Sequence, residues 1–193
     1  MKLEKNQKIS NAENPLQKPE FFGLIKNFIS DLPKRSQDII EKRFGLLSEE
    51  SETLEKIGKD YKITRERVRQ IITDAVKNIA KKSDEASFRQ AEEWLIFTIE
   101  KNSGIIKEKK IVNLLGLEDF KEKNALRLFV QCSKKVEEVF ERGILDKSWV
   151  LSKDTVDLVK KVHLEAKDIL EKEKNPLNND DIIKKIQERI IET

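Results

Sequence analysis

The sequence predicts a mainly α-helical fold: a helix-turn-helix domain, then a domain of three helices and a β-hairpin, then C-terminal helices. The 193 residues include only 6 glycines and 4 prolines, and lysine, glutamate, leucine and isoleucine are abundant, a composition that favours helices. Apolar residues recur at helical spacing along most of the chain. The exceptions are residues 136–140 and 149–151, which are β-favouring segments on either side of a turn at Gly143.

The first domain is expected at residues 20–82, after a flexible tail at 1–19 that is polar and aperiodic. Its first helix begins at Glu20 and ends before Pro33. The second helix carries apolar residues on one side and ends at Gly45, which is suited to a left-handed C-cap.

A short helix, a tight turn and a longer helix follow. Thr53 is a plausible N-cap for the short helix, and Thr64 for the longer one, which runs to about Lys81. Gly58 fits a place where the two helices cross closely. Each helix has one apolar face, made of Leu54, Ile57, Tyr61, Val68, Ile71, Ile72, Ala75 and Ile79. This spacing predicts a helix-turn-helix.

The longer helix carries polar side chains opposite its apolar face. With Val68 at the centre of the buried face and about 100° per residue, the outward residues are Glu66, Arg69, Gln70 and Thr73, and the flanking ones are Arg65 and Arg67. Arginine can pair with guanine, glutamate with cytosine and glutamine with adenine in a major groove. Residues 64–82 hold six basic and two acidic residues, whereas the whole chain carries only +3. The pattern predicts sequence-specific binding of double-stranded DNA.

A hinge at 82–87 is expected to lead to a second domain at 88–152. Three helices followed by a β-hairpin is the order of a winged helix. Residues 153–193 are expected to form two more helices, with a break at 175–177. Because two helices alone make a thin core, this segment either packs on the second domain or belongs to an incomplete module.

Few residue types suited to catalysis are present. The single cysteine (Cys132) and single histidine (His163) exclude an intrachain disulfide and ordinary zinc sites, so we expect no metal, no cofactor and no enzyme activity. Glu108-Lys109-Lys110 fits the loose E-x-K string of some nucleases, but no strand with an aspartate precedes it. With no secretory signal and no apolar run near the roughly 20 residues that span a bilayer, a cytoplasmic location is expected.

Three strings in the first domain resemble region 4 of housekeeping-type (sigma-70 family) sigma factors. They are RFG at 43–45, TLEKIG at 53–58 and TRERVRQI at 64–71, within a match of about residues 30–82. In that family the domain binds the upstream promoter element through its recognition helix, and it also binds the flap of the RNA polymerase β subunit.

The resemblance assigns roles to residues of this chain. Arg65, Glu66 and Gln70 match base-reading residues, and Arg69 matches an arginine at the groove. Arg43, Thr53 and Leu54 match phosphate contacts. The DNA-binding residues expected here are therefore Arg43, Thr53, Leu54, Thr64, Arg65, Glu66, Arg67, Arg69, Gln70 and Thr73.

The chain also departs from the family. Asp74 and Glu41 stand where basic residues are usual, which is expected to weaken phosphate affinity. Nothing resembles the region that melts the promoter, so independent initiation is not expected. Residues 88–151 and 163–189 more faintly resemble winged-helix domains of the HARE-HTH type, and the last of these modules would be incomplete.

The sequence therefore predicts a DNA-binding transcription regulator of the bacterial type that reads a promoter-like duplex and contacts the RNA polymerase β-flap. The alternative is an RNA polymerase accessory or protein-interaction module with little DNA affinity. A nuclease subunit is a third and weaker alternative.

Overall fold

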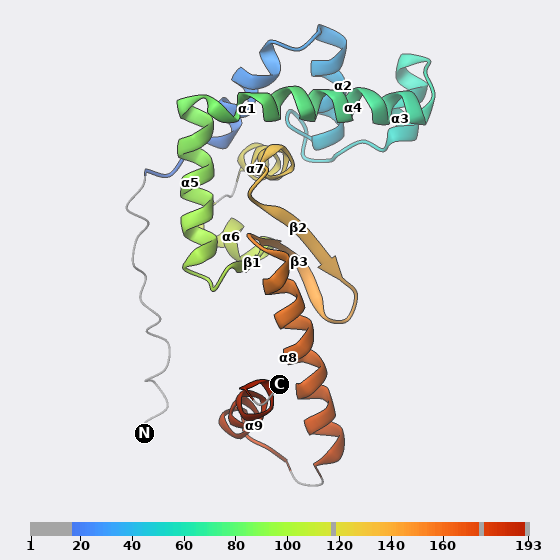
Figure 1. Cartoon of the computed structure of the whole chain (residues 1–193). Coiled ribbons are helices and arrows are strands. Elements are labelled where there is room, and N and C mark those ends of the chain that lie inside the picture. The colour runs from blue at the N-terminus through green and yellow to red at the C-terminus, as the bar shows by residue number, and fades with distance from the viewer. Residues whose placement is uncertain (1–16, 117–118, 174–175, 192–193) are drawn as a thin grey trace. The chain divides into compact units, whose positions relative to one another are not determined.

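The computed structural model describes residues 17–116, 119–173 and 176–191. Residues 1–16 of the expected tail lie outside the described residues. The described ranges form helices and a small three-stranded antiparallel sheet (Figure 1), which confirms the mainly helical fold class. The chain divides into two compact units, Met1–Thr98 with Leu117–Lys134, and Ile99–Gly116 with Lys135–Thr193.

Unit 1 contains the predicted helix-turn-helix. Its helices are α1 (Phe21–Ser30), α2 (Lys34–Phe44), α3 (Leu54–Tyr61), α4 (Arg65–Ala80), most of α5 (Ala86–Glu100), and α7 (Phe120–Cys132). The helices predicted in this part of the chain are confirmed. The glycine at the end of α2 also takes its predicted role, because Gly45 has a left-handed φ of 66° and is buried.

The expected hinge at 82–87 is helical in the structure. A 3₁₀ turn at Lys81–Asp84 follows α4 directly, and α5 begins at Ala86. Lys82 forms ion pairs with Asp31 and Glu85, so this junction is tied to the end of α1. The prediction of a hinge was wrong, since Ser83 and the charged residues that suggested it also suit a helix turn.

Helix α7 completes the core of unit 1 although it lies far from α1 in the sequence. Phe129 packs between Phe21 and Phe88, with ring centroids 5.4 and 4.7 Å apart. The Glu122 carboxylate accepts hydrogen bonds of 2.9 Å from the backbone N–H groups of Phe21 and Phe22, at the start of α1. The segment expected to form one domain at 88–152 is therefore shared between the two compact units. The predicted domain boundaries, 20–82, 88–152 and 153–193, stay a prediction.

Unit 2 is built on the sheet. Its elements are β1 (Ile105–Lys107), α6 (Glu108–Leu114), β2 (Glu137–Glu141), β3 (Leu145–Val150), α8 (Lys153–Lys172) and α9 (Asn179–Ile191). The strand order is β1-β3-β2, and Trp149 of β3 pairs with Ile106 on one side and Glu138 on the other. The hairpin confirms the prediction. Strand β1 was missed, because three residues are too few to show an alternating pattern.

The C-terminal helix pair has the thin core expected of it. Ile169 is the one fully buried apolar side chain among the described residues of α8 and α9, whereas Leu158, Leu164, Leu170 and Ile183 are exposed. Arg189 of α9 forms ion pairs with Glu165 and Asp168 of α8. No helix in the described ranges is both long and apolar enough to cross a membrane.

Candidate nucleic-acid interface

Two threonines fix where α3 and α4 begin. The Thr53 hydroxyl accepts a 3.2 Å hydrogen bond from the backbone N–H of Lys56, and the Thr64 hydroxyl accepts one of 3.1 Å from that of Arg67. Each satisfies one donor that the helix start would otherwise leave unpaired. Both predicted N-caps are confirmed.

Gly58 allows the close turn between the two helices. The backbone N–H of Ile63 donates to the carbonyl of Gly58 at 2.9 Å. A Cβ atom on Gly58 would lie 2.8 Å from the Ile63 carbonyl oxygen, closer than carbon and oxygen tolerate. Glycine is therefore required where the sequence places it.

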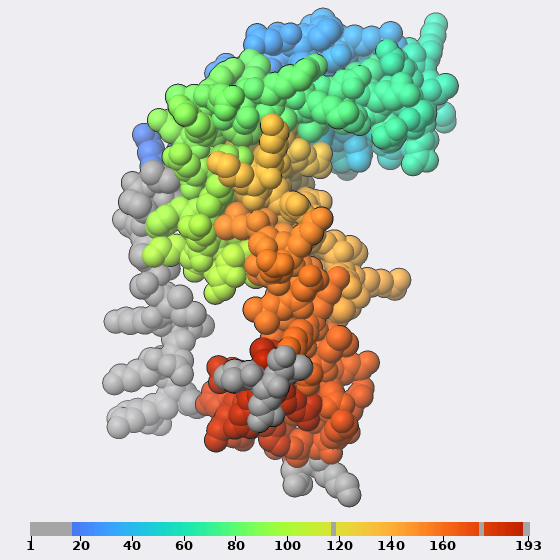
Figure 2. Space-filling model, viewed as in Figure 1, coloured from blue at the N-terminus to red at the C-terminus, as the bar shows by residue number. Residues whose placement is uncertain are grey.

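The apolar core beneath α4 decides which face of that helix is exposed. Ile39, Ile57 and Val68 are fully buried together, and partly buried side chains pack around them. This anchors α4 by its inner face. The side chains expected on the outer face and its flanks are exposed in the structure, namely Arg65, Glu66, Arg67, Arg69 and Gln70. In Figure 2, α3 and the first turns of α4 lie at the surface of unit 1.

Thr73 differs from this group. Its side chain is half-buried, and its hydroxyl donates to the Arg69 carbonyl oxygen at 2.9 Å. Because this hydroxyl already donates its hydrogen to its own helix, it cannot donate the same hydrogen to a base. Among the predicted DNA-binding residues, Thr73 is therefore the least suited to contact a base.

Each exposed arginine of α4 contacts a neighbouring side chain, a carboxylate for Arg65 and Arg69 and an amide for Arg67. The Arg69 guanidinium donates two hydrogen bonds to Glu66, of 2.7 and 2.9 Å. This hydrogen bonding lowers the pKa of Glu66 and raises that of Arg69. Arg65 forms a 2.9 Å ion pair with Glu55 of α3, and Arg67 donates to the Gln70 side-chain oxygen at 3.2 Å. Binding to bases would exchange these contacts for contacts with DNA.

The residues expected to contact phosphates lie together at the start of α3. Arg43 donates to the Glu52 carbonyl oxygen at 3.1 Å, directly before the N-cap Thr53. Thr53 is exposed, whereas the Leu54 side chain is partly buried in the core. Leu54 can therefore offer a phosphate only its backbone N–H, at the first position of α3.

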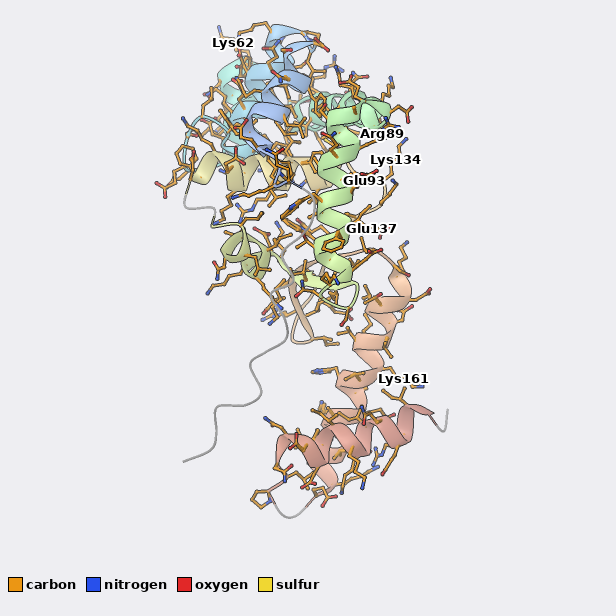
Figure 3. All side chains as sticks on the ribbon, turned by 90° about the vertical axis from the view of Figure 1, so that its left-hand side faces the viewer. Lys62, Arg89, Glu93, Lys134, Glu137 and Lys161 are labelled. Carbon is orange, nitrogen blue, oxygen red and sulfur yellow. The ribbon has the colours of Figure 1, made fainter. Side chains whose placement is uncertain are left out.

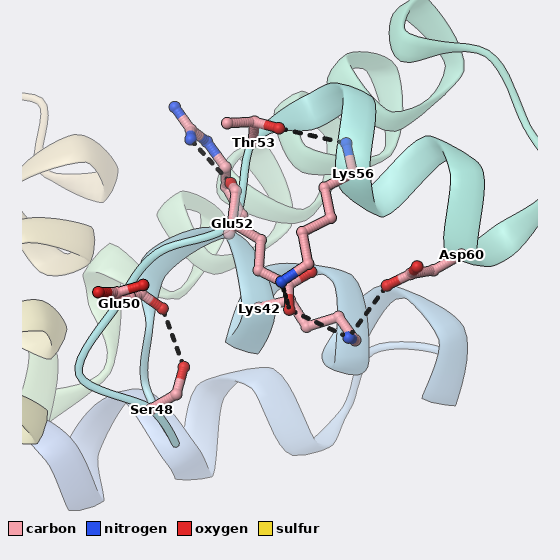
Figure 4. Close-up of polar contacts among 8 residues, drawn as sticks. Lys42, Ser48, Glu50, Glu52, Thr53, Lys56 and Asp60 are labelled. Carbon is pink, nitrogen blue, oxygen red and sulfur yellow. Dashed lines mark hydrogen bonds and ion pairs between the residues drawn. The ribbon is translucent and has the colours of Figure 1, made fainter.

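Two lysines beside this helix start were not among the predicted residues. Lys56 lies in the first turn of α3 and forms a 3.2 Å ion pair with Glu52. Lys42 contacts Glu52 and Asp60, each at 3.4 Å (Figure 4). Lys56 could have been predicted from the sequence, because it lies three residues after the N-cap Thr53 and so places a cation in the first turn of the helix. Figure 3 labels a third lysine, Lys62, at the turn between α3 and α4.

Glu41 is a structural residue. The sequence suggested that it stands in place of a basic phosphate contact, but its side chain is buried and forms an ion pair with Lys26 of α1. Glu41 is therefore neutralised inside unit 1, and the expectation that the missing basic residue weakens phosphate affinity stays a prediction. Asp74 is exposed on α4, as that expectation requires.

The remaining candidates for chemistry have structural surroundings. Glu108 of the E-x-K string is buried and forms a 3.0 Å ion pair with Lys147. Cys132 is buried, and burial raises the pKa of its thiol to about 12, which keeps it protonated and unreactive. Within the described parts of the chain, no three His, Cys, Asp or Glu side chains are grouped so that they could hold a metal ion.

Comparison with known proteins assigns a family to the α2–α4 segment. The family model "Sigma-70, region 4" matches residues 28–81. Residues 28–81 are a sigma-70 region 4 domain. RNA polymerase sigma factor RpoD from two strains of Helicobacter pylori (ATCC 700392 / 26695 and J99 / ATCC 700824) is similar, with 37% identity over 75 residues in each case. The similarity covers 38% of this chain, which spans only 11% of the length of each relative.

The region 4 domain accounts for α2, α3 and α4 together with the last residues of α1. Region 4 domains are a non-enzymatic, DNA-binding family, which applies here to residues 28–81. The match ends at residue 81, so α5 and α7 complete unit 1 from outside it. The HARE-HTH resemblance of 88–151 and 163–189 stays a prediction.

Proposed function

We propose that the region 4 domain binds promoter-type duplex DNA with α4 in the major groove and acts in transcription initiation. One observation carries the proposal: five polar side chains on α4, from Arg65 to Gln70, are exposed, while Val68 between them is fully buried. A helix fixed by its inner face presents its outer side chains in constant positions. Arginine, glutamate and glutamine in such positions suit direct readout of bases.

The helix starts at Thr53 and Thr64 supply the phosphate contacts in this proposal. Their first backbone N–H groups and the nearby guanidinium of Arg43 favour anions. Contacts of this kind set the orientation of the domain on the duplex, and the α4 side chains then select the sequence. RNA polymerase is a further proposed partner, since region 4 domains bind it as well as promoter DNA.

Selection from a randomised duplex pool tests the proposal. The intact chain is incubated with the pool at low and at physiological salt, and the bound fraction is sequenced. Enrichment of one short motif is expected, because base contacts discriminate between sequences while phosphate contacts do not. Binding without any enrichment would contradict base reading by α4.

The pairing of the arginines favours a second function, an RNA polymerase-binding module with little DNA affinity. Arg65 and Arg69 are both paired with carboxylates, and Asp74 adds an exposed negative charge to α4. The same chain is therefore also tested by pull-down with core RNA polymerase. Polymerase binding together with no duplex binding at low salt would identify this second function.

A further inference from the structure

Helix α8 in unit 2 carries a row of residues spaced like the core of a coiled coil. Alternating steps of three and four residues separate its members, which are Val156, Val159, His163, Ala166 and Leu170. With about 100° per residue, all five lie within one narrow band of the helix surface. None of them is fully buried, and Leu170 is 54% exposed. We refer to these five residues as the α8 stripe.

Helix α9 packs on another side of α8. Arg189 is bonded to Glu165 and Asp168, and the buried contact between the helices centres on Ile169. On a helical projection Glu165 and Asp168 lie about 140° to 160° from the middle of the stripe. Ile169 lies nearer, about 100° from the middle of the stripe, so the α9 contact borders the stripe and leaves Leu170 exposed and the other four stripe residues partly exposed.

Lysines follow one edge of the stripe. Lys153, Lys160 and Lys167 recur every seven residues, directly beside the apolar positions. Lys160 is paired with Glu141 of β2, and Lys167 forms a long 3.8 Å ion pair with Glu171 on the same helix, while the Lys153 and Lys167 side chains both lie at exposed positions. In a helix pair, charges at this place decide which partner fits.

We propose that the α8 stripe is the docking surface for an acidic amphipathic helix of another protein. That helix would place apolar side chains every three or four residues against the stripe and a row of Asp or Glu against the lysines. A second copy of this chain fits poorly, since two antiparallel α8 helices would bring their lysine rows together, and in a parallel pair the lysines would face Val162 and Ile169, which carry no negative charge. The proposal is separate from DNA binding, because none of the residues assigned to DNA lies in unit 2.

A designed peptide tests the docking surface. The probe is a fluorescein-labelled helical peptide of about three heptads, with leucine at the core positions and glutamate along one edge. Its affinity for the intact chain is measured by fluorescence anisotropy. Leu170→Ala is expected to weaken binding on the order of tenfold, as removal of an apolar anchor does. Lys167→Glu is expected to weaken it about threefold or more, and added salt should weaken binding to the wild type.

Helix α8 itself supplies matched controls. Leu164 is 61% exposed but lies about 120° from the stripe, and Lys161, which Figure 3 labels, lies on the opposite side from it. Leu164→Ala and Lys161→Glu should leave the affinity unchanged, and circular dichroism verifies that every variant is folded. A probe with lysine in place of glutamate should bind more weakly.

Three results would overturn the proposal. The folded wild type could fail to bind the glutamate probe, or Leu164→Ala could weaken binding as much as Leu170→Ala. Light scattering could instead show that the chain alone is a dimer that Leu170→Ala dissociates, in which case the stripe joins two copies of this chain.

Discussion

At the scale of single residues, the exposed side chains of α4 contact one another through an ion pair and a hydrogen bond. The two hydrogen bonds from Arg69 hold Glu66 in one orientation, and Arg67 does the same for Gln70. Because these side chains are already restrained, they would lose less conformational entropy on binding DNA. Binding would also have a free-energy cost, since each contact must be exchanged for one with a base. Exposed ion pairs contribute little stability, so breaking them costs little free energy.

Replacing Gln70 by alanine tests base reading by one side chain. Gln70→Ala is expected to weaken binding to the selected duplex by about 1–3 kcal/mol and to relax the preference at one base pair. Affinities for the selected site and its single-base variants are measured by anisotropy. Gln90→Ala, at an exposed position on α5, is the matched control and should change nothing. An equal loss on every duplex would mean that Gln70 does not read a base.

Replacing Arg43 tests the phosphate contact at the start of α3. Arg43→Ala should weaken binding to all duplexes alike and reduce the slope of log affinity against log salt by about one. Because Arg43 also bonds the Glu52 carbonyl, thermal unfolding is measured in parallel to detect any loss of stability. Lys184→Ala on α9 is the control. An unchanged salt slope would remove Arg43 from the interface.

At the scale of elements, local signals made the helix-turn-helix predictable. Thr53 and Thr64 as caps, Gly45 at a left-handed position and Gly58 at a close approach each act within a few residues of their place in the sequence. Contacts over long distances could not be read in this way. Glu122 bonds the start of α1 from about 100 residues away, and nothing near Glu41 in the sequence indicates its partner Lys26. The exposed face of α4 was therefore predicted, whereas the packing of α7 was not.

The bond between α7 and the start of α1 depends on pH. Partial burial and the nearby Glu20 carboxylate raise the pKa of Glu122, although the two backbone N–H groups oppose that shift. A carboxyl with a raised pKa binds its proton more tightly in the folded chain than in the unfolded chain. This contribution to stability is present at acidic pH and is lost as pH rises through the folded pKa.

Two substitutions of Glu122 separate charge from hydrogen bonding. Glu122→Ala removes both acceptors at the start of α1 and should cost about 1–2 kcal/mol of unfolding free energy at pH 7. Glu122→Gln keeps an acceptor without the charge, so it should cost less. The stability of the wild type relative to Glu122→Gln should fall as pH rises from the ordinary pKa of a glutamate through the raised pKa of the folded chain. Urea unfolding at several pH values measures this difference. Equal losses for both substitutions would argue against the hydrogen bonds, and a difference between wild type and Glu122→Gln that does not change with pH would refute the assigned role of charge.

At the scale of the molecule, the region 4 domain shares one core with helices from outside the family match. Asn124 of α7 is buried, and its side-chain amide donates a 3.0 Å hydrogen bond to the carbonyl of Gly45, at the corner after α2. Its oxygen accepts from Arg127 at 3.1 Å. The left-handed turn that leads toward α3 is thus held by a helix about 80 residues further along the chain.

This contact predicts that a destabilising substitution in α7 also destabilises α2, α3 and α4. Asn124→Ala leaves the Gly45 carbonyl without that donor inside the core and should cost about 1–3 kcal/mol. If unit 1 unfolds as one cooperative body, hydrogen exchange in α2, α3 and α4 should accelerate together with that in α7. Gln131→Ala, an exposed amide on the same helix, is the matched control and should leave exchange unchanged. Faster exchange confined to α7 would show instead that α2–α4 fold independently of it, and the region 4 domain could then be studied alone.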